Sequence, residues 1–331
     1  MTKTIVSASL AVLCAGPLSA ASLELNDIFG SFGAVAQSYS GNSESEGRVI
    51  IAGDATGNIS VNDREIGANA DGFDDLIITG DATNANITVG QSGNVTIGGD
   101  LSNTNLQLNG GVQTVTLGGT RSGGNFNQNE DILIQNATNT NIPEVDFSFL
   151  QSEAARLGGL GGLFSVDTNA SGQLVFGGAS VLDLDFSVLG SGTGVFDLSG
   201  IDTLIINVAG NGGNIGLNFV DYLGAGVLDA AQSVVWNFFE ATGTINLNTA
   251  LFGHVLAPSA TVNVNSSNEG SVIASTLFSN NGELHPLAFD GTIPPAGGDD
   301  LTPVPLPAGG LLLLTAIAGF FGLRRRGTAP A

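Results

Sequence analysis

Short apolar triplets recur along the chain, each followed by a glycine turn and then by a strand in which apolar and polar residues alternate. The turns contain Gly-Asp or Gly-Thr pairs, in the segments Val49–Asp54, Leu76–Asp81, Val95–Asp100 and Val115–Thr120, the last three of which are almost evenly spaced. Alternating strands follow at Ile59–Asn62, Ile87–Gly90 and Leu106–Asn109. Strands of this length with a turn at each corner are typical of a β-solenoid, whose stacked coils share one core.

The pattern returns near the C-terminus, where Thr244–Asn248 aligns with Thr261–Asn265 and Val255–Ala257 aligns with Val272–Ala274 at the same shift. An apolar coil face cannot be buried alone, so the repeat predicts stacked coils here as well. Residues 164–230 contain strand-like runs with a weaker repeat. We therefore predict an all-β fold, a β-solenoid over residues 22–293.

One segment has helical instead of strand periodicity. Its apolar residues fall three or four positions apart, at Phe147, Leu150, Ala154 and Leu157. Acidic residues come early and Arg156 comes late, which favours an amphipathic helix over about 144–163. We expect this helix to cover the flank of the solenoid; a partner-binding helix is the alternative.

Composition narrows the class of protein. The 331 residues include 49 Gly and only 10 Pro, and 42% are hydrophobic. The absence of a Gly-X-Y period excludes collagen, the hydrophobic fraction argues against disorder, and abundant Gly and Asn disfavour a helical protein. Gly and Asn tolerate the left-handed backbone conformations that solenoid corners need.

The charge is strongly negative, with a formal net of −22. The part of the chain between the two end segments contains all 30 carboxylates and only four cations, a formal net charge of −26. The four cations are Arg48, Arg64, Arg121 and Arg156. Nucleic acid is excluded as a partner, because its affinity depends on Lys and Arg that neutralise phosphates. Divalent cations, neutral glycans and proteins remain as partners.

Residues 1–21 are typical of a secretory signal peptide. Lys3 precedes the apolar segment Ile5–Ala15, and a small-residue cleavage region follows at Ser19, Ala20 and Ala21. The only cysteine, Cys14, lies in the apolar segment, so cleavage would leave no disulfide or Cys-based metal site. Lipidation of Cys14 is an alternative that Leu13 disfavours, because a small residue is expected there.

The opposite end predicts a transmembrane helix. Residues 308–323 form an uncharged apolar run, followed by Arg324, Arg325 and Arg326 as a membrane stop. As a helix the run would span about 24 Å, against a hydrocarbon core of about 30 Å. The arginines and the tail, 327–331, would stay in the cytoplasm and leave the body outside. A buried hydrophobic helix is the alternative.

Two features precede the apolar run: an acidic Pro/Gly linker, 294–303, and the motif Val304, Pro305, Leu306, Pro307 and Ala308. Together with the run and the arginines, residues 304–326 resemble the VPLPA type of PEP-CTERM sorting signal of Gram-negative bacteria. The resemblance implies an exosortase, a membrane transpeptidase that cleaves near the motif. The protein would be anchored transiently in the inner membrane and then moved to the cell surface or extracellular matrix.

The body carries a second resemblance, on five segments: Glu46–Val49, Val235–Phe238, Val255–Pro258, Gly270–Ala274 and Gly282–His285. Together they resemble the choice-of-anchor A domain, which is found ahead of diverse surface-anchoring signals. The resemblance covers roughly residues 22–294. It implies an adhesive surface domain with a β-helix-like fold and no established catalytic residues.

Metal chemistry has limited support. His254 and His285 have no partner at a zinc-ligand spacing, and His254, at a strand start, is expected to be exposed or to cap a turn. Calcium is the one cofactor left open, with two candidate sets of oxygen ligands: Asp71, Asp74 and Asp75, or Asp54, Asp81 and Asp100 stacked at one corner. The alternative for the second set is turn residues that each bond to their own backbone.

Glycosidase chemistry is the alternative function from another class. Asp183 and Asp185 would share one face of a strand about 7 Å apart, within the range for inverting enzymes. Alternation on a solvated strand also produces such pairs, and one Trp and two Tyr provide few sugar-stacking rings. We expect no enzymatic activity.

Binding through a flat face is the other function that the sequence allows. Thr244, Asn246 and Asn248 alternate with apolar residues, and the next coil repeats the pattern with Thr261, Asn263 and Asn265. Coils about 4.8 Å apart would align these residues into a ladder that binds a glycan, a matrix protein or ice. Ice binding favours ranks of Thr-x-Thr, for which Thr114–Thr116 is the clear instance. The alternative is that these residues only solvate the outer face.

Overall fold

The structure is a computed structural model that describes residues 23–62, 73–90, 93–109, 114–138, 140, 142–162, 166–177, 180–223 and 226–295. The chain divides into two compact units, Met1–Ile293 and Pro294–Ala331. The predicted signal peptide, sorting motif, apolar run and arginine triplet lie outside the described residues. Among the helices that are described, none is long and apolar enough to cross a membrane.

Two series of strands build the first unit. The N-terminal series is β1 (Ala34–Gly41), β2 (Val49–Ile51), β3 (Ala55–Val61), β4 (Leu76–Ile78), β5 (Ala82–Val89), β6 (Val95–Ile97), β7 (Leu101–Ser102), β8 (Asn105–Leu108), β9 (Val115–Leu117), β10 (Arg121–Ser122) and β11 (Leu133–Ile134). The C-terminal series is β12 (Val166–Thr168), β13 (Leu174–Gly177), β14 (Val181–Asp185), β15 (Gly192–Asp197), β16 (Leu204–Ala209), β17 (Gly213–Ile215), β18 (Leu217–Leu223), β19 (Val234–Asn237), β20 (Thr244–Leu247), β21 (Leu251–Phe252), β22 (His254–Val264), β23 (Asn268–Glu269), β24 (Val272–Ser279) and β25 (Leu284–His285).

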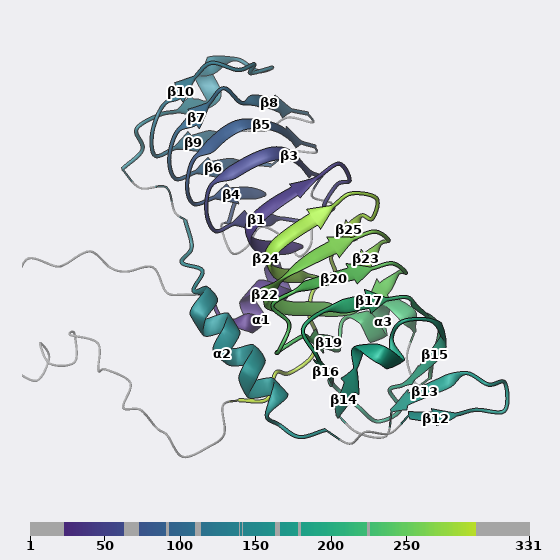
Figure 1. The fold of residues 1–331 in the computed structure, drawn as a ribbon. Coiled ribbons are helices and arrows are strands. Elements are labelled where there is room, and N and C mark those ends of the chain that lie inside the picture. Colours follow the sequence, from purple (N-terminus) through teal and green to yellow (C-terminus); the bar gives the residue numbers. More distant parts are fainter. Residues whose placement is uncertain are drawn as a thin grey trace, which may run out of the picture. The chain divides into compact units, whose positions relative to one another are not determined.

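These strands stack in parallel, coil upon coil (Figure 1). Within the described residues, the largest sheet has 13 strands, with the main order β11-β9-β6-β4-β2-β1-β24-β22-β19-β16-β14. Its neighbours pair in parallel throughout, as in β2 with β4 and β22 with β24. The antiparallel pair β12–β13 belongs to a separate four-stranded sheet. Parallel strands joined by short corners confirm the predicted all-β, β-helix-like fold.

The order of the coils in space differs from their order in the chain. The first strand, β1, lies in the middle of the main sheet, between β2 and β24. From β1 the chain winds outward to β11; it then resumes at β14, the opposite end of the main sheet, and winds back to β24. Figure 1 shows this as purple β1 beside yellow-green β24. We call the pairing of β1 with β24 the seam.

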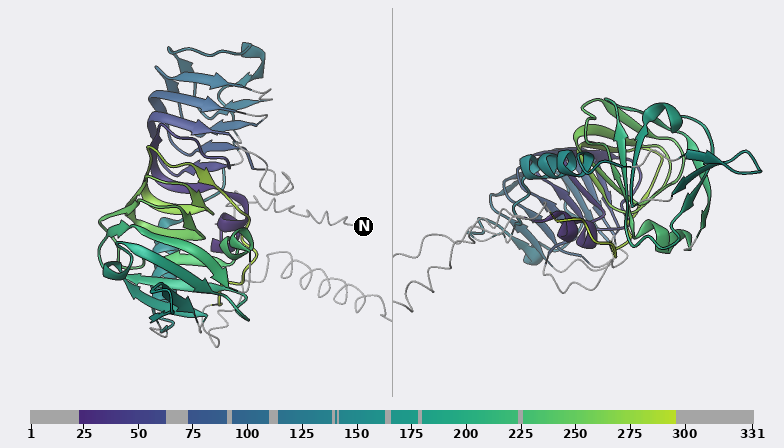
Figure 2. Two further views of the ribbon diagram at one scale, coloured as in Figure 1. Left: turned by 90° about the vertical axis from the view of Figure 1, so that its right-hand side faces the viewer. Right: turned by 90° about the horizontal axis from the view of Figure 1, so that it is seen from below.

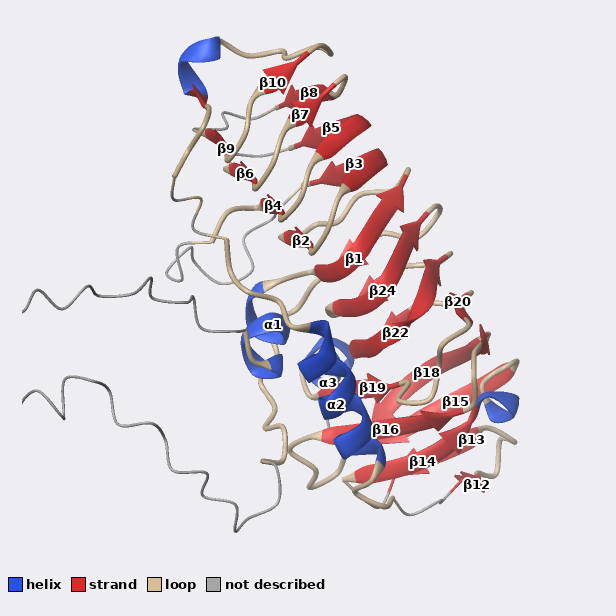
Figure 3. Cartoon of the chain, turned by 60° about the vertical axis from the view of Figure 1, so that its left-hand side comes forward, coloured by secondary structure: helices blue, strands red, loops and turns tan. Residues whose placement is uncertain are grey.

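Two helices, α1 (Leu25–Ser31) and α2 (Phe147–Gly158), cover one side of the main sheet (Figures 2 and 3). The third described helix is α3 (Val227–Ala231), and two 3₁₀ turns, η1 (Glu130–Ile132) and η2 (Phe186–Val188), are also described. The predicted flanking helix is confirmed as α2, whose buried residues are the four that the periodicity indicates: Phe147, Leu150, Ala154 and Leu157. Asp146 begins it by accepting from the backbone N–H groups of Ser148 and Phe149.

The core has two layers, which explains the apolar triplets. Val49 and Ile51 of β2 point into the solenoid interior, whereas Ile50 between them belongs to a second cluster that includes residues of α1 and α2. Ile77 of β4 takes the same place one coil further on. In β6 and β9 the middle residue is a threonine, Thr96 or Thr116. In these four coils, the middle residue of the triplet is therefore apolar where it packs in the second layer, in β2 and β4, and is a threonine in β6 and β9.

Candidate functional site

The predicted ligand residues lie on the outward side of neighbouring parallel strands. The alternating side chains of β20 and β22 are buried in the interior at Ile245, Leu247, Val262 and Val264. The register pairs Thr244 with Thr261 and Asn246 with Asn263. Because side chains alternate across a strand, the residues between the buried ones face outward. We call Thr244, Asn246, Asn248, Thr261, Asn263 and Asn265 the polar face.

The asparagines of the polar face are hydrogen-bonded from coil to coil. Asn263 Nδ2 donates to Asn246 Oδ1 over 2.7 Å, and Asn246 donates in turn to Asn214 over 2.9 Å. Asn265 donates to Asn248 over 3.0 Å. A carboxamide has two N–H donors and two acceptor lone pairs, so a ladder bond uses only part of its capacity. The ladder fixes these side chains and leaves part of their donor and acceptor capacity unused.

A row of hydroxyl groups continues the polar face across the seam. Thr261 is in register with Thr276 of β24, and Thr276 is in register with Ser38 of β1. Neighbouring strands lie about 4.8 Å apart, which sets the spacing along the row. We call Thr244, Thr261, Thr276 and Ser38 the hydroxyl row. The coils of both chain halves therefore contribute to one ordered surface.

The Thr-x-Thr segment does not join this row. Thr116 is in register with Thr96, which is buried, and through it with Ile77 and Ile50. At Ile50 and Ile77, the end of this column nearer the seam, the side chains belong to the second core layer. Thr114–Thr116 is therefore separate from the polar face.

The stacked aspartates of the Gly-Asp corners bond to backbone. Asp54 Oδ1 accepts from the backbone N–H of Asp81 over 2.9 Å, and Asp81 accepts from that of Asp100 over 2.7 Å. Asp100 accepts from the backbone N–H of Thr120 over 2.6 Å. Each carboxylate thus bonds to the next coil instead of to its own turn. The alternative that each aspartate bonds to its own turn is therefore not what the structure shows, because these bonds join successive coils.

The other calcium candidates divide between described and undescribed residues. Asp71 lies outside the described residues. Asp74 accepts a hydrogen bond from the Thr96 hydroxyl of the next coil. Asp75 is buried, and a side chain on Gly93 would collide with its carboxylate. Both carboxylates therefore pack against the neighbouring coil, and calcium binding stays a prediction.

The two carboxylates of the glycosidase alternative have separate structural roles. Asp183 accepts from the backbone N–H of Gly162 over 2.7 Å and from Asn207 Nδ2 over 3.0 Å. Asp185 caps η2, and hydrogen bonds from the side chain and backbone of Ser187 hold its pKa below the usual value. A general acid needs a raised pKa, so the shift at Asp185 is opposite to that requirement.

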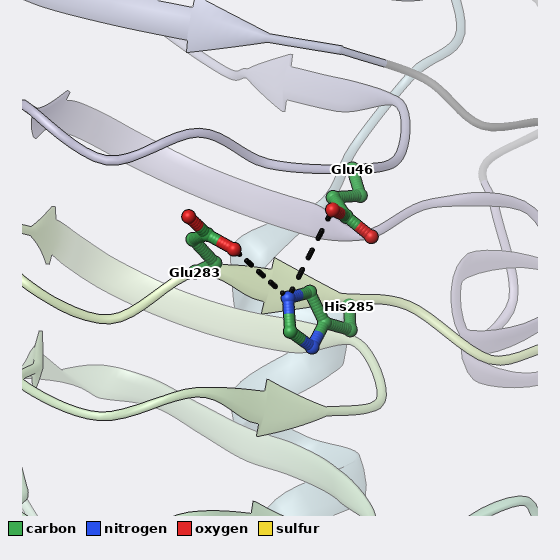
Figure 4. A group of neighbouring side chains, drawn as sticks. All are labelled: Glu46, Glu283 and His285. Carbon is green, nitrogen blue, oxygen red and sulfur yellow. Dashed lines mark hydrogen bonds and ion pairs between the residues drawn. The ribbon is translucent and has the colours of Figure 1, made fainter.

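A cluster of ionisable residues lies at the seam, and we call Glu46, Glu269, Glu283 and His285 the seam cluster. His285 Nδ1 lies 2.8 Å from Glu269 Oε1, and its Nε2 lies 3.1 Å from Glu283 Oε2. Glu46 Oε1 lies 4.0 Å from Nε2. Figure 4 shows Glu46 and Glu283 turned towards the imidazole. Three carboxylates thus surround one imidazole.

Backbone pairing positions this cluster. Glu269 of β23 is in register with His285 of β25, and the backbone N–H of Glu46 donates to the carbonyl of Leu284 over 2.8 Å. The cluster therefore occupies three successive coils, with Glu46 in the first coil of the chain and the others in the last two. Burial alone would lower the pKa of His285, but hydrogen bonds to Glu269 and Glu283 and the charges of Glu269 and Glu46 raise it overall.

The expectation for His254 is wrong, because this side chain is buried instead of exposed. Its Nδ1 accepts from the backbone N–H of Ser271 over 3.2 Å. Its ring centre lies 4.8 Å from that of Phe29 and 5.2 Å from that of Phe289. Burial lowers the pKa of His254 to about 3, so the ring is neutral at pH 7. Although it begins β22, the ring lies in the core and packs there as an aromatic group.

His285 has ionisable partners, although none of them is at a zinc-ligand spacing in the sequence. Its partners are Glu283 two residues earlier, Glu269 in the preceding coil and Glu46 near the start of the chain. The sequence separations between these residues differ from those of known zinc motifs. Two signals were present in the sequence. Glu283 and His285 share one side of a strand, and the C-terminal repeat brings Glu269 alongside His285. The contact with Glu46 depends on the seam, which no local pattern predicts.

Comparison with known protein families matches most of the chain to a family model. Residues 26–286 match the family described as "Putative Ice-binding-like adhesive domain", which covers the described solenoid almost completely. Comparisons with curated proteins and with solved structures found no match. The resemblances to choice-of-anchor A and PEP-CTERM proteins stay predictions. The chain belongs to the family of ice-binding-like adhesive domains.

Proposed function

We propose that this protein is an exported cell-surface or extracellular-matrix β-solenoid that acts as an adhesin or structural protein and binds its ligand through the polar face. The observation that carries the proposal is the cross-coil ladder of Thr and Asn, held in register by parallel pairing. Membership of an adhesive-domain family supports the same function. We propose no enzymatic role, because Asp183 and Asp185 each serve a local hydrogen-bonding role.

The favoured ligand is a neutral glycan or a matrix protein. Each ladder amide keeps donor and acceptor capacity that can meet hydroxyl or peptide groups at a regular spacing. The body of the chain, with its formal net of −26 between the end segments, would repel an acidic polysaccharide at low salt. A rigid ladder also loses little side-chain entropy when a ligand binds.

Export and sorting complete the proposal. The signal peptide at 1–21 would direct secretion, and an exosortase-type transpeptidase would act on the motif Val304–Ala308. The apolar run 308–323 would hold the chain in the inner membrane of a Gram-negative cell before processing. These assignments rest on the sequence alone and are tested by the mass of the mature surface protein. An intact tail with Arg324–Arg326 on that protein would contradict sorting with cleavage.

Ice is the second candidate ligand, favoured by the hydroxyl row. Thr244, Thr261, Thr276 and Ser38 form a regular rank of hydroxyl groups, and the family is described as ice-binding-like. Ordered waters could occupy the spaces between such hydroxyl groups. Thermal hysteresis and inhibition of ice recrystallisation by the purified protein would support this ligand over a glycan.

A binding array tests the polar face. Purified full-length protein is applied to immobilised neutral and acidic polysaccharides and to matrix proteins, together with variant Thr261→Lys. We expect saturable binding to a neutral ligand and at least a tenfold weaker affinity in the variant, because a hydrated lysine blocks close approach. The matched control is Thr193→Lys, at an exposed position on β15 in a different sheet.

Thr193→Lys should bind as the unchanged protein does. Equal affinity for all three proteins would place the ligand away from the polar face. No saturable binding to any array component, together with no activity on ice, would contradict the adhesive proposal itself.

A further inference from the structure

The seam cluster has the ligand chemistry of a metal site. Glu46, Glu283 and His285 each offer one ligand atom, and these atoms lie within 4.8 Å of one another. They come from two stretches of chain, Glu46 in one and Glu283 with His285 in the other, which only the coil stacking brings together (Figure 4). The three carboxylates around the imidazole carry one negative charge each, and a protonated His285 would neutralise only one of them. The cluster therefore favours a cation with a charge above +1.

The distances match a tetrahedral ion. Bonds of about 2.1 Å to His nitrogen and carboxylate oxygen place neighbouring ligand atoms about 3.4 Å apart in tetrahedral geometry. His285 Nε2 lies 3.1 Å from Glu283 Oε2 and 4.0 Å from Glu46 Oε1, on either side of that value. A small rotation of the Glu46 side chain would complete the three ligands. A fourth position would remain for water.

Glu269 supplies the outer partner that such a site needs. Metal-binding histidines generally donate their second ring N–H to a carboxylate, which fixes the tautomer and the ring orientation. Glu269 Oε1 lies 2.8 Å from His285 Nδ1, and its side chain is largely buried. With the proton on Nδ1, the lone pair of Nε2 points towards Glu283 and Glu46. The imidazole is thus held in the orientation in which it can bind a metal ion.

We propose that the seam cluster binds a divalent first-row transition metal ion through His285 Nε2, Glu283 and Glu46, with Glu269 positioning the imidazole. Imidazole with carboxylates suits zinc and its neighbours in that row. The ion would join the first coil of the chain to the last, because Glu46 precedes β2 and His285 lies in β25. Metal binding would therefore stabilise the closed seam by mass action.

The experiment uses purified full-length protein stripped of metal by a chelator. Zn²⁺ binding is measured by calorimetry and by the shift in Tm, and Co²⁺ is added as a spectroscopic probe. We expect one equivalent to bind, Tm to rise, and visible Co²⁺ absorption bands typical of a four-coordinate site to develop. Glu283→Gln and His285→Gln should each weaken binding at least tenfold, and Glu269→Gln should weaken it about 10- to 100-fold.

The matched control is Glu44→Gln, which removes the same charge close to Glu46 in the chain but outside the cluster. It should bind Zn²⁺ with unchanged affinity. Glu283 is about half exposed, so its variant should keep the fold and separate binding from folding. Equal binding by Glu283→Gln, His285→Gln and the unchanged protein would overturn the proposal, as would the absence of saturable binding or of a Co²⁺ spectrum.

Discussion

At the scale of single residues, the Gly-Asp corner is a unit of coil stacking. Asp81 bonds to the backbone N–H of Asp100, and a Cβ atom on Gly99 would fall within contact distance of the Asp81 carboxylate. Gly80 and Gly119 stand in the same relation to Asp54 and Asp100. The glycine is therefore needed for space, because none of the three has a left-handed backbone. The motif is periodic because each coil accommodates the carboxylate of its neighbour.

Gly99→Ala should destabilise the protein by about 1–3 kcal/mol, because the added methyl group must displace a hydrogen-bonded carboxylate. Gly190→Ala is the control, since a Cβ at that position meets no atom within 4 Å. The control should be neutral or stabilising by up to about 1 kcal/mol. Midpoints of urea unfolding measure both effects. Equal midpoints for the two variants would show that the corner tolerates a side chain.

His254 should make stability fall in mild acid. Burial holds its folded pKa at about 3, whereas the unfolded value is 6.5, so the unfolded state binds the proton first. Stability is therefore full above pH 6.5 and is lost as the pH falls from 6.5 towards 3. The loss between pH 7 and pH 5 is about 2 kcal/mol.

Urea unfolding at a series of pH values measures this loss, and His254→Asn provides the comparison. Asparagine keeps an acceptor for the backbone N–H of Ser271 but does not titrate. The variant should be less stable at pH 7 and should lack the slope between pH 6.5 and pH 5. A variant with the original slope would assign the acid sensitivity to another group.

At the scale of elements, the sequence predicted the strands and α2 because their periodicities are local. The buried face of α2 follows from the spacing of four apolar residues, and the corners follow from Gly-Asp pairs. The short helices α1 and α3 have too few turns for such a pattern. The sequence did not predict the second core layer either. Val49 lies in the solenoid interior and Ile50 in the second layer, but the two residues are equally hydrophobic, so the sequence does not distinguish their positions.

The polarity of the middle residue of each triplet indicates whether the second core layer covers that coil. Ile50→Thr should cost about 1–3 kcal/mol, because it places a hydroxyl group in the apolar second layer. The reciprocal change Thr116→Ile, in the same column but only partly buried, should change stability by less than about 0.5 kcal/mol. Urea unfolding compares them. Similar losses in the two variants would mean that the column is uniformly packed.

At the scale of the whole folded unit, the seam joins residues that are remote in the chain. Seven register pairs connect β1 with β24, and the Ser275 hydroxyl donates to Gln37 near the opposite end of the unit. Repeats predict which coils stack within each series, but no local pattern indicates that β1 pairs with β24. The choice of β24 as partner also creates the seam cluster and carries the hydroxyl row across both halves.

A covalent link across the seam should raise the free energy of unfolding more than a link between coils that are close in the chain. Ala36 of β1 is in register with Ala274 of β24, and both are buried in the solenoid interior. Strands about 4.8 Å apart fall within the Cα separation that a disulfide accepts. The predicted mature chain has no other cysteine, since Cys14 lies in the signal peptide. Variant Ala36→Cys/Ala274→Cys can therefore form one defined bridge.

Oxidation of this double variant should stabilise it by about 2–4 kcal/mol over its reduced form, because the bridge closes a very long loop in the unfolded chain. The Tm of the oxidised protein should rise by several degrees, and the reduced protein serves as its own control for the two substitutions. Refolding should also become faster, since the most remote pairing is already made and loop closure no longer limits it. A bridged protein that unfolds and refolds like the reduced one would show that the coils separate elsewhere first. If no bridge forms under oxidising conditions, β1 and β24 are not neighbours, and the hydroxyl row and seam cluster lose the contact on which they depend.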